Sequence, residues 1–341
     1  MIINSIFIII SFLSLLELFS CRKVFILFVI PLILMAILAG IRSVGGTDYD
    51  VYQLYFESLP DVIYSYGYGY YILNCFVKYI FNDFNALIAV SSICAVFIQG
   101  WYFYRSSSKP TLCLMMFYAV GFIWLDMVLI RQSIAAGFLL IATDYFFRKK
   151  ILLASVFVIC ATMFHEVAII IAISGVIFLS INSKHYLKII FISIILLWWL
   201  KVIIIYLNQA IFHNGNIDAY LNEPSFISGS LLIDFCFALF IYSLSKKQKE
   251  NIPKNEYKLY QVIIFLGVGI IMASYLLPVM ARLTEYIKFF YVLMTVAFIS
   301  RQNKISNKLF MFIVLFIYCA IRLNIFLTQF DGGFVYSSYI A

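Results

Sequence analysis

Two sets of ionisable residues interrupt long apolar stretches of this sequence. Arg131 stands at the start of one apolar stretch, which ends at the basic turn Arg148–Lys150, and His165 and Glu166 lie within the next stretch. Ionisable side chains inside hydrocarbon-length segments are costly and usually serve a function. An arginine donates two parallel hydrogen bonds to a phosphate, and an imidazole or a carboxylate can accept a proton from a hydroxyl. This combination predicts a polar site for an anionic substrate.

The lengths of the two stretches predict that Arg131 and His165 lie near each other. Residues 151–181 would form ~46 Å of helix, about 31 residues, whereas two membrane crossings need roughly 40 residues. The turn at His165 is therefore expected to stop short of the far interface. Arg131 lies ~25 Å of helix from the basic turn and Phe164 lies ~21 Å from it. In upright helices, Arg131 and His165 would differ in depth by about one helical turn.

Further candidate site residues lie near the start of the chain, in a tyrosine-rich segment over residues 42–67. This segment follows the apolar residues 24–41. Arg42 precedes the pair Gly45–Gly46, and Asp48 follows it. Asp48 can serve in chemistry as a base, or it can cap a short helix that begins at Tyr49. The tyrosines can form an interfacial aromatic belt or a platform for sugar rings.

A third set lies late in the chain. Arg282, Glu285 and Tyr286 share one helix face because they are spaced i, i+3, i+4. Arg282 can bind an anionic group, or it can simply pair with Glu285. Similar alternatives hold for Arg131, which can reach lipid phosphate at the interface, and for His165, which can be a packing residue.

Composition places these residues in a membrane protein. The chain has 341 residues, of which 65% are hydrophobic and 12% are charged, and its mean hydropathy is +1.02. Soluble domains do not have this composition. We expect an all-α fold, a polytopic transmembrane helical bundle of about twelve spans that forms a single membrane-embedded domain over residues 1–341. The expected spans are 2–19, 24–41, 84–104, 111–129, 131–147, 151–164, 166–181, 187–206, 228–245, 259–277, 283–300 and 309–327. Residues 68–81 are expected to form a short re-entrant or interfacial helix.

The distribution of basic residues predicts the orientation of the bundle. One set of loops, which includes the loop 246–258, carries 17 of the 24 lysines and arginines and is expected to face the cytoplasm. Both termini and the loops 42–67 and 207–227 then lie on the outer side. The positive-inside rule also accounts for the net charge of +8, so we expect no nucleic-acid partner. The seven cysteines form no CxxC pair and no cluster of ligand residues is evident, so we expect no metal.

Four short motifs, taken in order, resemble the EpsG-like family of Wzy-type polymerases of bacterial O-antigen and exopolysaccharide. They are Arg42 with GGTDY (45–49), IRQSIAAG (130–137), FHE (164–166) and ARLTEYIKFF (281–290). The resemblance covers nearly the whole chain. It implies a GT-C-like helical fold, lipid-linked substrates, no cofactor and a site on the periplasmic face of the bacterial inner membrane.

The resemblance implies that the protein joins undecaprenyl-diphosphate-linked oligosaccharide repeat units in lipopolysaccharide or exopolysaccharide biosynthesis. Arg131, Arg282 and Arg42 are the candidates for binding the substrate diphosphate. His165, Asp48, Glu166 and Glu285 are the candidate catalytic bases, and Tyr49, Tyr52, Gln132 and Tyr286 are the candidates for contacting sugar. A Wzz-like chain-length regulator and a flippase are the implied protein partners. A flippase of lipid-linked oligosaccharide and an O-antigen ligase remain the alternative functions.

Overall fold

The computed structural model describes residues 2–44, 48–59, 66–208, 229–247, 249, 252–329 and 336–338. The expected outer loop 207–227 lies almost wholly outside these residues. So do Gly45–Gly46 in the first outer loop and residues 248, 250 and 251 of the loop 246–258.

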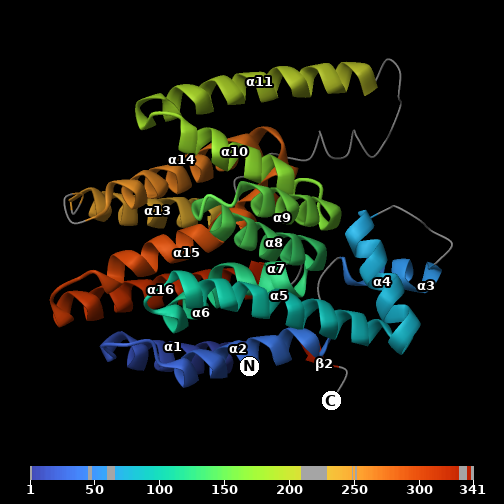
Figure 1. Cartoon of the computed structure of the whole chain (residues 1–341), viewed down its shortest axis with the longest axis horizontal. Coiled ribbons are helices and arrows are strands. Elements are labelled where there is room, and N and C mark those ends of the chain that lie inside the picture. The colour runs from blue at the N-terminus through green and yellow to red at the C-terminus, as the bar shows by residue number, and fades with distance from the viewer. Residues whose placement is uncertain are drawn as a thin grey trace. The chain divides into compact units, whose positions relative to one another are not determined.

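Helices make up nearly all of the described chain (Figure 1). In order, the elements are α1 (Ile2–Phe19), α2 (Phe25–Gly40), β1 (Arg42–Val44), α3 (Tyr49–Ser58), α4 (Tyr68–Phe81), α5 (Phe84–Ser106), α6 (Pro110–Phe117), a π-helical turn (Tyr118–Phe122), α7 (Ile123–Met127), α8 (Ile130–Phe147), α9 (Ile151–Phe164), α10 (Ala168–Ser180), a 3₁₀ turn (Ser183–His185), α11 (Tyr186–Leu207), α13 (Gly229–Lys247), α14 (Lys254–Leu276), a 3₁₀ turn (Pro278–Leu283), α15 (Thr284–Ser300), α16 (Ile305–Gln329) and β2 (Ser337–Ser338).

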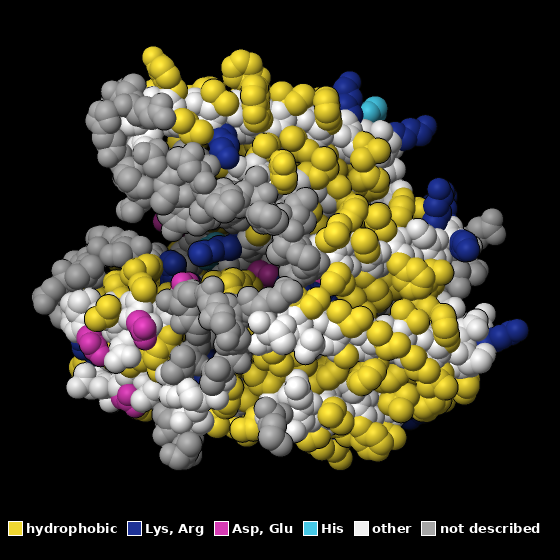
Figure 2. All heavy atoms as spheres, turned by 180° about the vertical axis from the view of Figure 1, so that it is seen from behind, with side chains coloured by type: hydrophobic (Ala, Val, Ile, Leu, Met, Phe, Trp, Pro, Cys, Tyr) yellow, Lys and Arg dark blue, Asp and Glu magenta, His cyan; other side chains and the backbone are white. Residues whose placement is uncertain are grey.

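The prediction of an all-α, multi-pass membrane protein is confirmed. Each of the twelve expected spans coincides with a helix, and the expected span 111–129 consists of α6, the π-helical turn and α7 in series. Among the described residues, 7 helices are long and apolar enough to cross a membrane, and Phe25–Gly40, Ile151–Phe164 and Ala168–Ser180 are shorter apolar helices. Hydrophobic side chains cover much of the surface drawn in Figure 2, as a lipid-facing surface requires.

The chain divides into two compact units. Unit 1 comprises Met1–Ala172 and Thr295–Ala341, and unit 2 comprises Ile173–Met294. Arg131, His165 and the first outer loop belong to unit 1, whereas Arg282 and Glu285 belong to unit 2. Each unit is therefore described by itself.

In unit 1, helices α8 and α9 form an antiparallel hairpin, and α5 packs against both α2 and α8 (Figure 1). Helix α1 packs on α6 through a buried carboxylate. The Oε2 atom of Glu17 accepts hydrogen bonds from the backbone amides of Thr111, at 2.9 Å, and Leu112, at 3.2 Å. These amides belong to the first turn of α6, where the helix itself offers no acceptor. Glu17 thus serves as a cap that one helix supplies to another.

One end of unit 1 collects three of the basic loops that are expected to face the cytoplasm. The Nζ atom of Lys23 donates to the carbonyl of Tyr104 at 2.7 Å. Next to it, Arg105 and Arg148 both pair with Asp144, with Nε–carboxylate distances of 3.2 Å and 3.0 Å. The helices of unit 1 therefore alternate in direction as the charge pattern predicts, while the side of the membrane on which this end lies stays a prediction.

The opposite end of unit 1 joins the first outer loop to the end of the chain. Strands β1 and β2 form a two-stranded antiparallel sheet, in which Arg42 is opposite Ser338. The hydroxyls of Ser43 and Ser337 lie 2.8 Å apart, and Tyr336 donates its hydroxyl to the carbonyl of Leu38 at 3.0 Å. Residues that are nearly 300 positions apart are thus fixed beside the start of α3.

In unit 2, α14 packs against both α11 and α13. Phe178, Tyr186, Ile190 and Val262 form its small buried cluster. The Nζ atom of Lys201, which lies within the apolar helix α11, donates to the carbonyl of Leu276 at 2.8 Å. Leu276 ends α14, so this lysine satisfies a carbonyl that the helix leaves without an intrahelical donor.

Candidate polar site in the first unit

Arg131 is the second residue of α8 and is held by the aromatic segment that precedes α4. Its Nη1 atom donates to the carbonyl of Tyr66 at 3.0 Å. The guanidinium lies over the ring of Tyr66, 4.8 Å from the centroid, and 5.8 Å from the ring centroid of Tyr52. Cation–π contacts of this kind favour a planar, weakly hydrated guanidinium. Arg131 is half-buried, so part of its side chain remains exposed.

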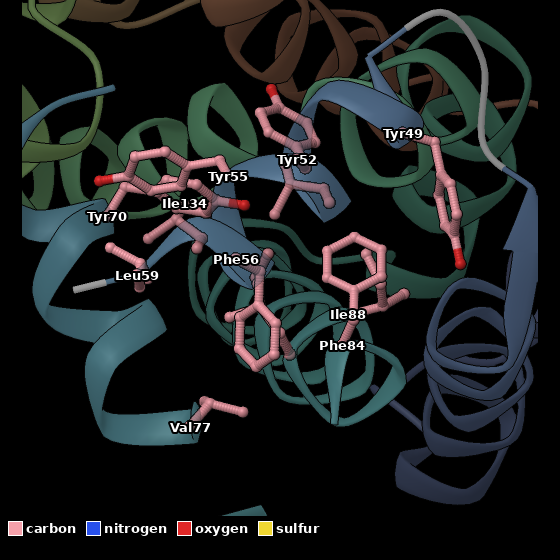
Figure 3. Close-up of a cluster of buried hydrophobic side chains, with 13 residues drawn as sticks. Tyr49, Tyr52, Tyr55, Phe56, Leu59, Tyr70, Val77, Phe84, Ile88 and Ile134 are labelled. Carbon is pink, nitrogen blue, oxygen red and sulfur yellow. The ribbon is translucent and has the colours of Figure 1, made fainter. Parts of the chain in front are cut away.

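The tyrosines that surround Arg131 form a packed aromatic cluster (Figure 3). Tyr52 and Tyr55 come from α3 and Tyr70 comes from α4, and each is at most 4% exposed. The ring centroids of Tyr52 and Tyr70 are 5.5 Å apart, and those of Tyr55 and Tyr66 are 4.9 Å apart in an edge-to-face arrangement. Tyr49 is also buried, with its ring against Phe84 at 5.2 Å. These rings form the core between α3, α4 and α5, so they lie neither on an open sugar platform nor in a lipid-facing belt.

A single glycine brings the end of α9 next to the segment that binds Arg131. Gly67 has φ +91°, a conformation that side chains with a Cβ rarely adopt. A Cβ atom at Gly67 would also lie 2.7 Å from the carbonyl oxygen of Met163. Because Tyr66 accepts the hydrogen bond from Arg131 and Gly67 packs on Met163, one short segment links the start of α8 to the end of α9.

His165 follows directly after this contact. It is half-buried, has extended backbone angles, and ends α9 by donating its amide to the carbonyl of Ala161 at 2.9 Å. The chain turns at residues 165–167, and Glu166 is exposed there. The expected short hairpin with a turn at His165 is therefore present, and both Arg131 and His165 lie at the same end of the α8–α9 pair.

Asp48 precedes α3, which begins at Tyr49 as expected, but Asp48 does not cap that helix through its side chain. Its backbone carbonyl accepts from the amide of Tyr52 at 3.0 Å. The carboxylate is half-buried. Gln132 follows Arg131 on α8 and is 2% exposed, so its side chain packs inside the unit.

Arg42 is fully buried at the end of α2. Its Nη1 atom donates to the carbonyl of Ala39 and, at 2.8 Å, to the hydroxyl of Ser92. Burial lowers the pKa of this guanidinium to about 10, and the negative charge of Asp126 opposes that shift. The side chain therefore stays protonated at neutral pH and carries a positive charge inside the protein.

Asp126 belongs to a buried polar network that the sequence analysis does not assign to the site. Its Oδ1 atom accepts a hydrogen bond from Gln99 at 2.8 Å and another from the hydroxyl of Ser133. Gln99 also donates to the hydroxyl of Ser133 at 3.1 Å. The network ties the end of α7 to the first turn of α8, two residues after Arg131. The sequence signal for it is an acidic residue near the end of an apolar segment, just before an arginine.

The late-chain candidates lie in unit 2. Glu285 is buried and forms an ion pair with Lys288, with 2.5 Å between Oε1 and Nζ. Lys288 is a second residue that the sequence analysis omits, although its i, i+3 spacing from Glu285 is a helical pairing signal. Arg282 is exposed in the 3₁₀ turn Pro278–Leu283, and Tyr286 is buried at 2% exposure.

Unit 1 thus brings together Arg131, Tyr52 and the α9 turn that carries His165. Arg42 lies deeper, beside Ser92. Among the residues that the structure describes, no three or more His, Cys, Asp or Glu side chains are close enough to hold a metal ion.

We expect Gly67→Ala to lower the free energy of unfolding by about 1–3 kcal/mol, because the new Cβ meets both backbone strain and a carbonyl oxygen. Thermal unfolding in detergent measures the change. Gly175→Ala is the matched control, because a Cβ at this helical position has nothing within 4 Å. A Gly67→Ala protein that unfolds at the same temperature as wild type would contradict the role of this glycine.

A comparison with known proteins agrees with the arrangement of motifs along the chain. A model of the EpsG family matches residues 25–339, which is nearly the whole length. No curated protein and no solved structure matches the chain. The chain therefore belongs to the EpsG family, a family of Wzy-like polymerases.

Proposed function

We propose that this protein polymerises oligosaccharide repeat units linked to undecaprenyl diphosphate, at the periplasmic face of a bacterial inner membrane. Membership of the EpsG family supports a polysaccharide polymerase-type function in general. The observation that carries the finer proposal is the setting of Arg131. A guanidinium held by a carbonyl and two aromatic rings, at the end of a membrane helix, suits a lipid-linked phosphate.

The reaction transfers a glycan chain from one lipid to the next repeat unit. A hydroxyl of the incoming unit attacks the anomeric carbon of the growing chain, and a new glycosidic bond forms. The bond between that carbon and the diphosphate oxygen breaks, so undecaprenyl diphosphate leaves with the electron pair. The proton of the attacking hydroxyl passes to a base. Negative charge grows on the leaving group, and a preorganised cation stabilises it best where water is scarce.

Arg131 is the first choice for stabilising the leaving diphosphate, with Arg282 and Arg42 as further candidates. His165 is the first choice for the base, followed by Asp48, Glu166 and Glu285. His165 is supported by its position after α9, at the end of the hairpin where Arg131 also lies. It can instead orient the acceptor sugar through a hydrogen bond, which an imidazole also allows.

Deletion of the gene in the source bacterium tests the function. We expect undecaprenyl diphosphate that carries a single repeat unit to accumulate, and polymer to disappear, as read by mass spectrometry of the lipid extract and by a polysaccharide gel. A plasmid copy should restore polymer. Persistent long-chain polymer in the deletion strain would contradict the polymerase and favour a ligase, which acts after the polymer is made.

Arg131→Lys should lower polymer formation about tenfold or more, because an ammonium cannot replace a bidentate donor and one hydrogen bond to a charged group is worth ~1.5–3 kcal/mol. Complementation of the deletion strain at matched protein level is the assay. Arg148→Lys is the control, since Arg148 pairs with Asp144 at the other end of α8 and a lysine keeps its charge. Wild-type polymer from Arg131→Lys would remove Arg131 from the site.

His165→Ala should abolish polymer beyond one repeat unit while protein levels stay unchanged. His165→Gln separates the two roles of the residue, because glutamine can donate a hydrogen bond but cannot take up a proton near neutral pH. Partial polymer from the glutamine variant indicates an orienting residue, and none indicates a base. Full polymer from His165→Ala would exclude both.

A further inference from the structure

One outward stripe of helix α5 carries apolar side chains along most of its length and an arginine at its end. Ile93, Phe97 and Trp101 are 44%, 46% and 41% exposed. Arg105 is exposed as well and follows Trp101 by four residues, which continues the i, i+4 spacing of one helix ridge. The stripe spans ~18 Å at ~1.5 Å per residue, close to roughly 15 Å, which is half of the ~30 Å hydrocarbon thickness of a bilayer. An acyl chain that ends in a charged head group presents the same order of surfaces.

The guanidinium of Arg105 is held in place at the end of this stripe. Its Nε atom lies 3.2 Å from Oδ1 of Asp144 on α8, and its Cζ atom lies 5.3 Å from the ring centroid of Trp101. A guanidinium that meets a carboxylate through Nε keeps its end-on edge, formed by the two Nη atoms, for a second anion. The side chain is 36% exposed, so a second anion can approach from outside. Arg105 is therefore oriented before a ligand arrives, which lowers the entropy that binding costs.

The charge beside Arg105 remains positive despite the carboxylate. The other oxygen of Asp144, Oδ2, lies 3.0 Å from Nε of Arg148, so two guanidinium groups share one carboxylate. Lys23 adds a cation, because its Nζ atom donates at 2.7 Å to the carbonyl of the peptide bond between Tyr104 and Arg105. That ammonium also lies 5.2 Å from the ring centroid of Tyr104, and Lys23 is exposed. An ammonium has three donors, so Lys23 retains donors for a phosphate oxygen.

A lipid-facing helix with positive charges at its end accounts for part of this pattern. Lysine and arginine side chains at such an end usually extend freely towards water. Arg105 and Lys23 are instead each tied to the protein, one by a carboxylate and the other by a backbone carbonyl. The two cations therefore form a fixed pair at the end of an apolar stripe.

We propose that one anionic phospholipid binds the surface formed by Ile93, Phe97, Trp101, Arg105 and Lys23. The lipid phosphate accepts hydrogen bonds from Arg105 and Lys23, and an acyl chain lies along the apolar side chains. The indole of Trp101 lies between the two, at the level where such rings favour the membrane interface. A zwitterionic lipid offers the same acyl chains, but the cation of its head group opposes binding. The inference goes beyond the proposed function, because this surface lies at the end of α8 opposite to Arg131.

The fluorescence of Trp101 tests the proposal. The chain has four tryptophans, so phenylalanine replaces the other three, Trp124, Trp198 and Trp199. The purified full-length protein is placed in phosphatidylcholine nanodiscs with increasing fractions of a lipid brominated in its acyl chain, either phosphatidylglycerol or phosphatidylcholine. Brominated phosphatidylglycerol should quench Trp101 with about twentyfold higher affinity, because each of the two cations contributes roughly fivefold. Equal quenching by the two lipids would overturn the site.

Arg105→Gln and Lys23→Gln should each lower the preference for the anionic lipid about fivefold. Both changes are mild, because Arg148 still pairs with Asp144 and Lys23 lies outside the helices. Lys184→Gln is the matched control, since it removes one positive charge from an exposed position in unit 2 and should leave the preference unchanged. A preference that survives both changes, or that falls equally in Lys184→Gln, would assign it to net charge and overturn the site.

Competition separates a lipid from a free anion. Excess unbrominated phosphatidylglycerol should restore the emission of Trp101, whereas inorganic phosphate at matched ionic strength should not, because it lacks the acyl chain. Emission restored equally by phosphate would assign the site to a free anion and overturn the lipid. Native mass spectrometry needs no tryptophan replacement: wild type should retain one phosphatidylglycerol that Arg105→Gln releases. Equal retention by the two proteins would contradict the site.

Discussion

A positive charge removed from water must receive acceptors, aromatic faces or a negative charge, and much of this protein's internal order follows from that requirement. Arg42 receives the carbonyl of Ala39, the hydroxyl of Ser92 and the nearby charge of Asp126. Arg131 receives one carbonyl and two aromatic rings. Lys288 receives a carboxylate. Of the three, Arg131 has its hydrogen bond to a backbone carbonyl alone and the greatest exposure to solvent, which are the properties expected of a ligand-binding cation.

The position of Arg131 depends on a break between two helices. Helix α7 ends at Met127 and α8 begins at Ile130, so the chain must be fixed across two non-helical residues. The Asp126 carboxylate bridges this break by accepting hydrogen bonds from Gln99 on α5 and Ser133 on α8. A π-helical turn precedes α7, and such turns recur near functional sites because the extra residue rotates the helix that follows. The break between α7 and α8, the π-helical turn before α7 and the Asp126 carboxylate together set the direction in which α8 begins.

Much of the fold could be predicted from the sequence, because hydrophobic runs and basic turns report helix ends directly. The expected segments 68–81 and 151–164 match α4 and α9 residue for residue, and the pairing of Asp144 with Arg105 and Arg148 agrees with the expected alternation of helix direction. The interior of the site was less predictable. Tyrosine has an apolar ring and a polar hydroxyl, so its sequence position does not distinguish a core residue from a surface platform. Asp126 could be located in the sequence, but its partners depend on packing between helices. Lys288 could also be located there, but whether it pairs with Glu285 inside the protein depends on which face of its helix is buried.

The burial of the aromatic cluster separates two tasks that a lipid-linked glycan imposes on a protein. A phosphate needs fixed donors in a place of low water content, whereas a sugar ring needs an exposed aromatic face and exchangeable hydrogen bonds. Tyr52 and Tyr70, at 3% and 0% exposure, present no face to solvent; their rings pack against each other, and the ring of Tyr52 contacts the guanidinium of Arg131. Tyr68, at 49% exposure, has an open ring at the start of the same helix α4. The tyrosine-rich segment therefore combines buried rings with one exposed ring, and Gly67, with φ +91°, immediately precedes the exposed Tyr68.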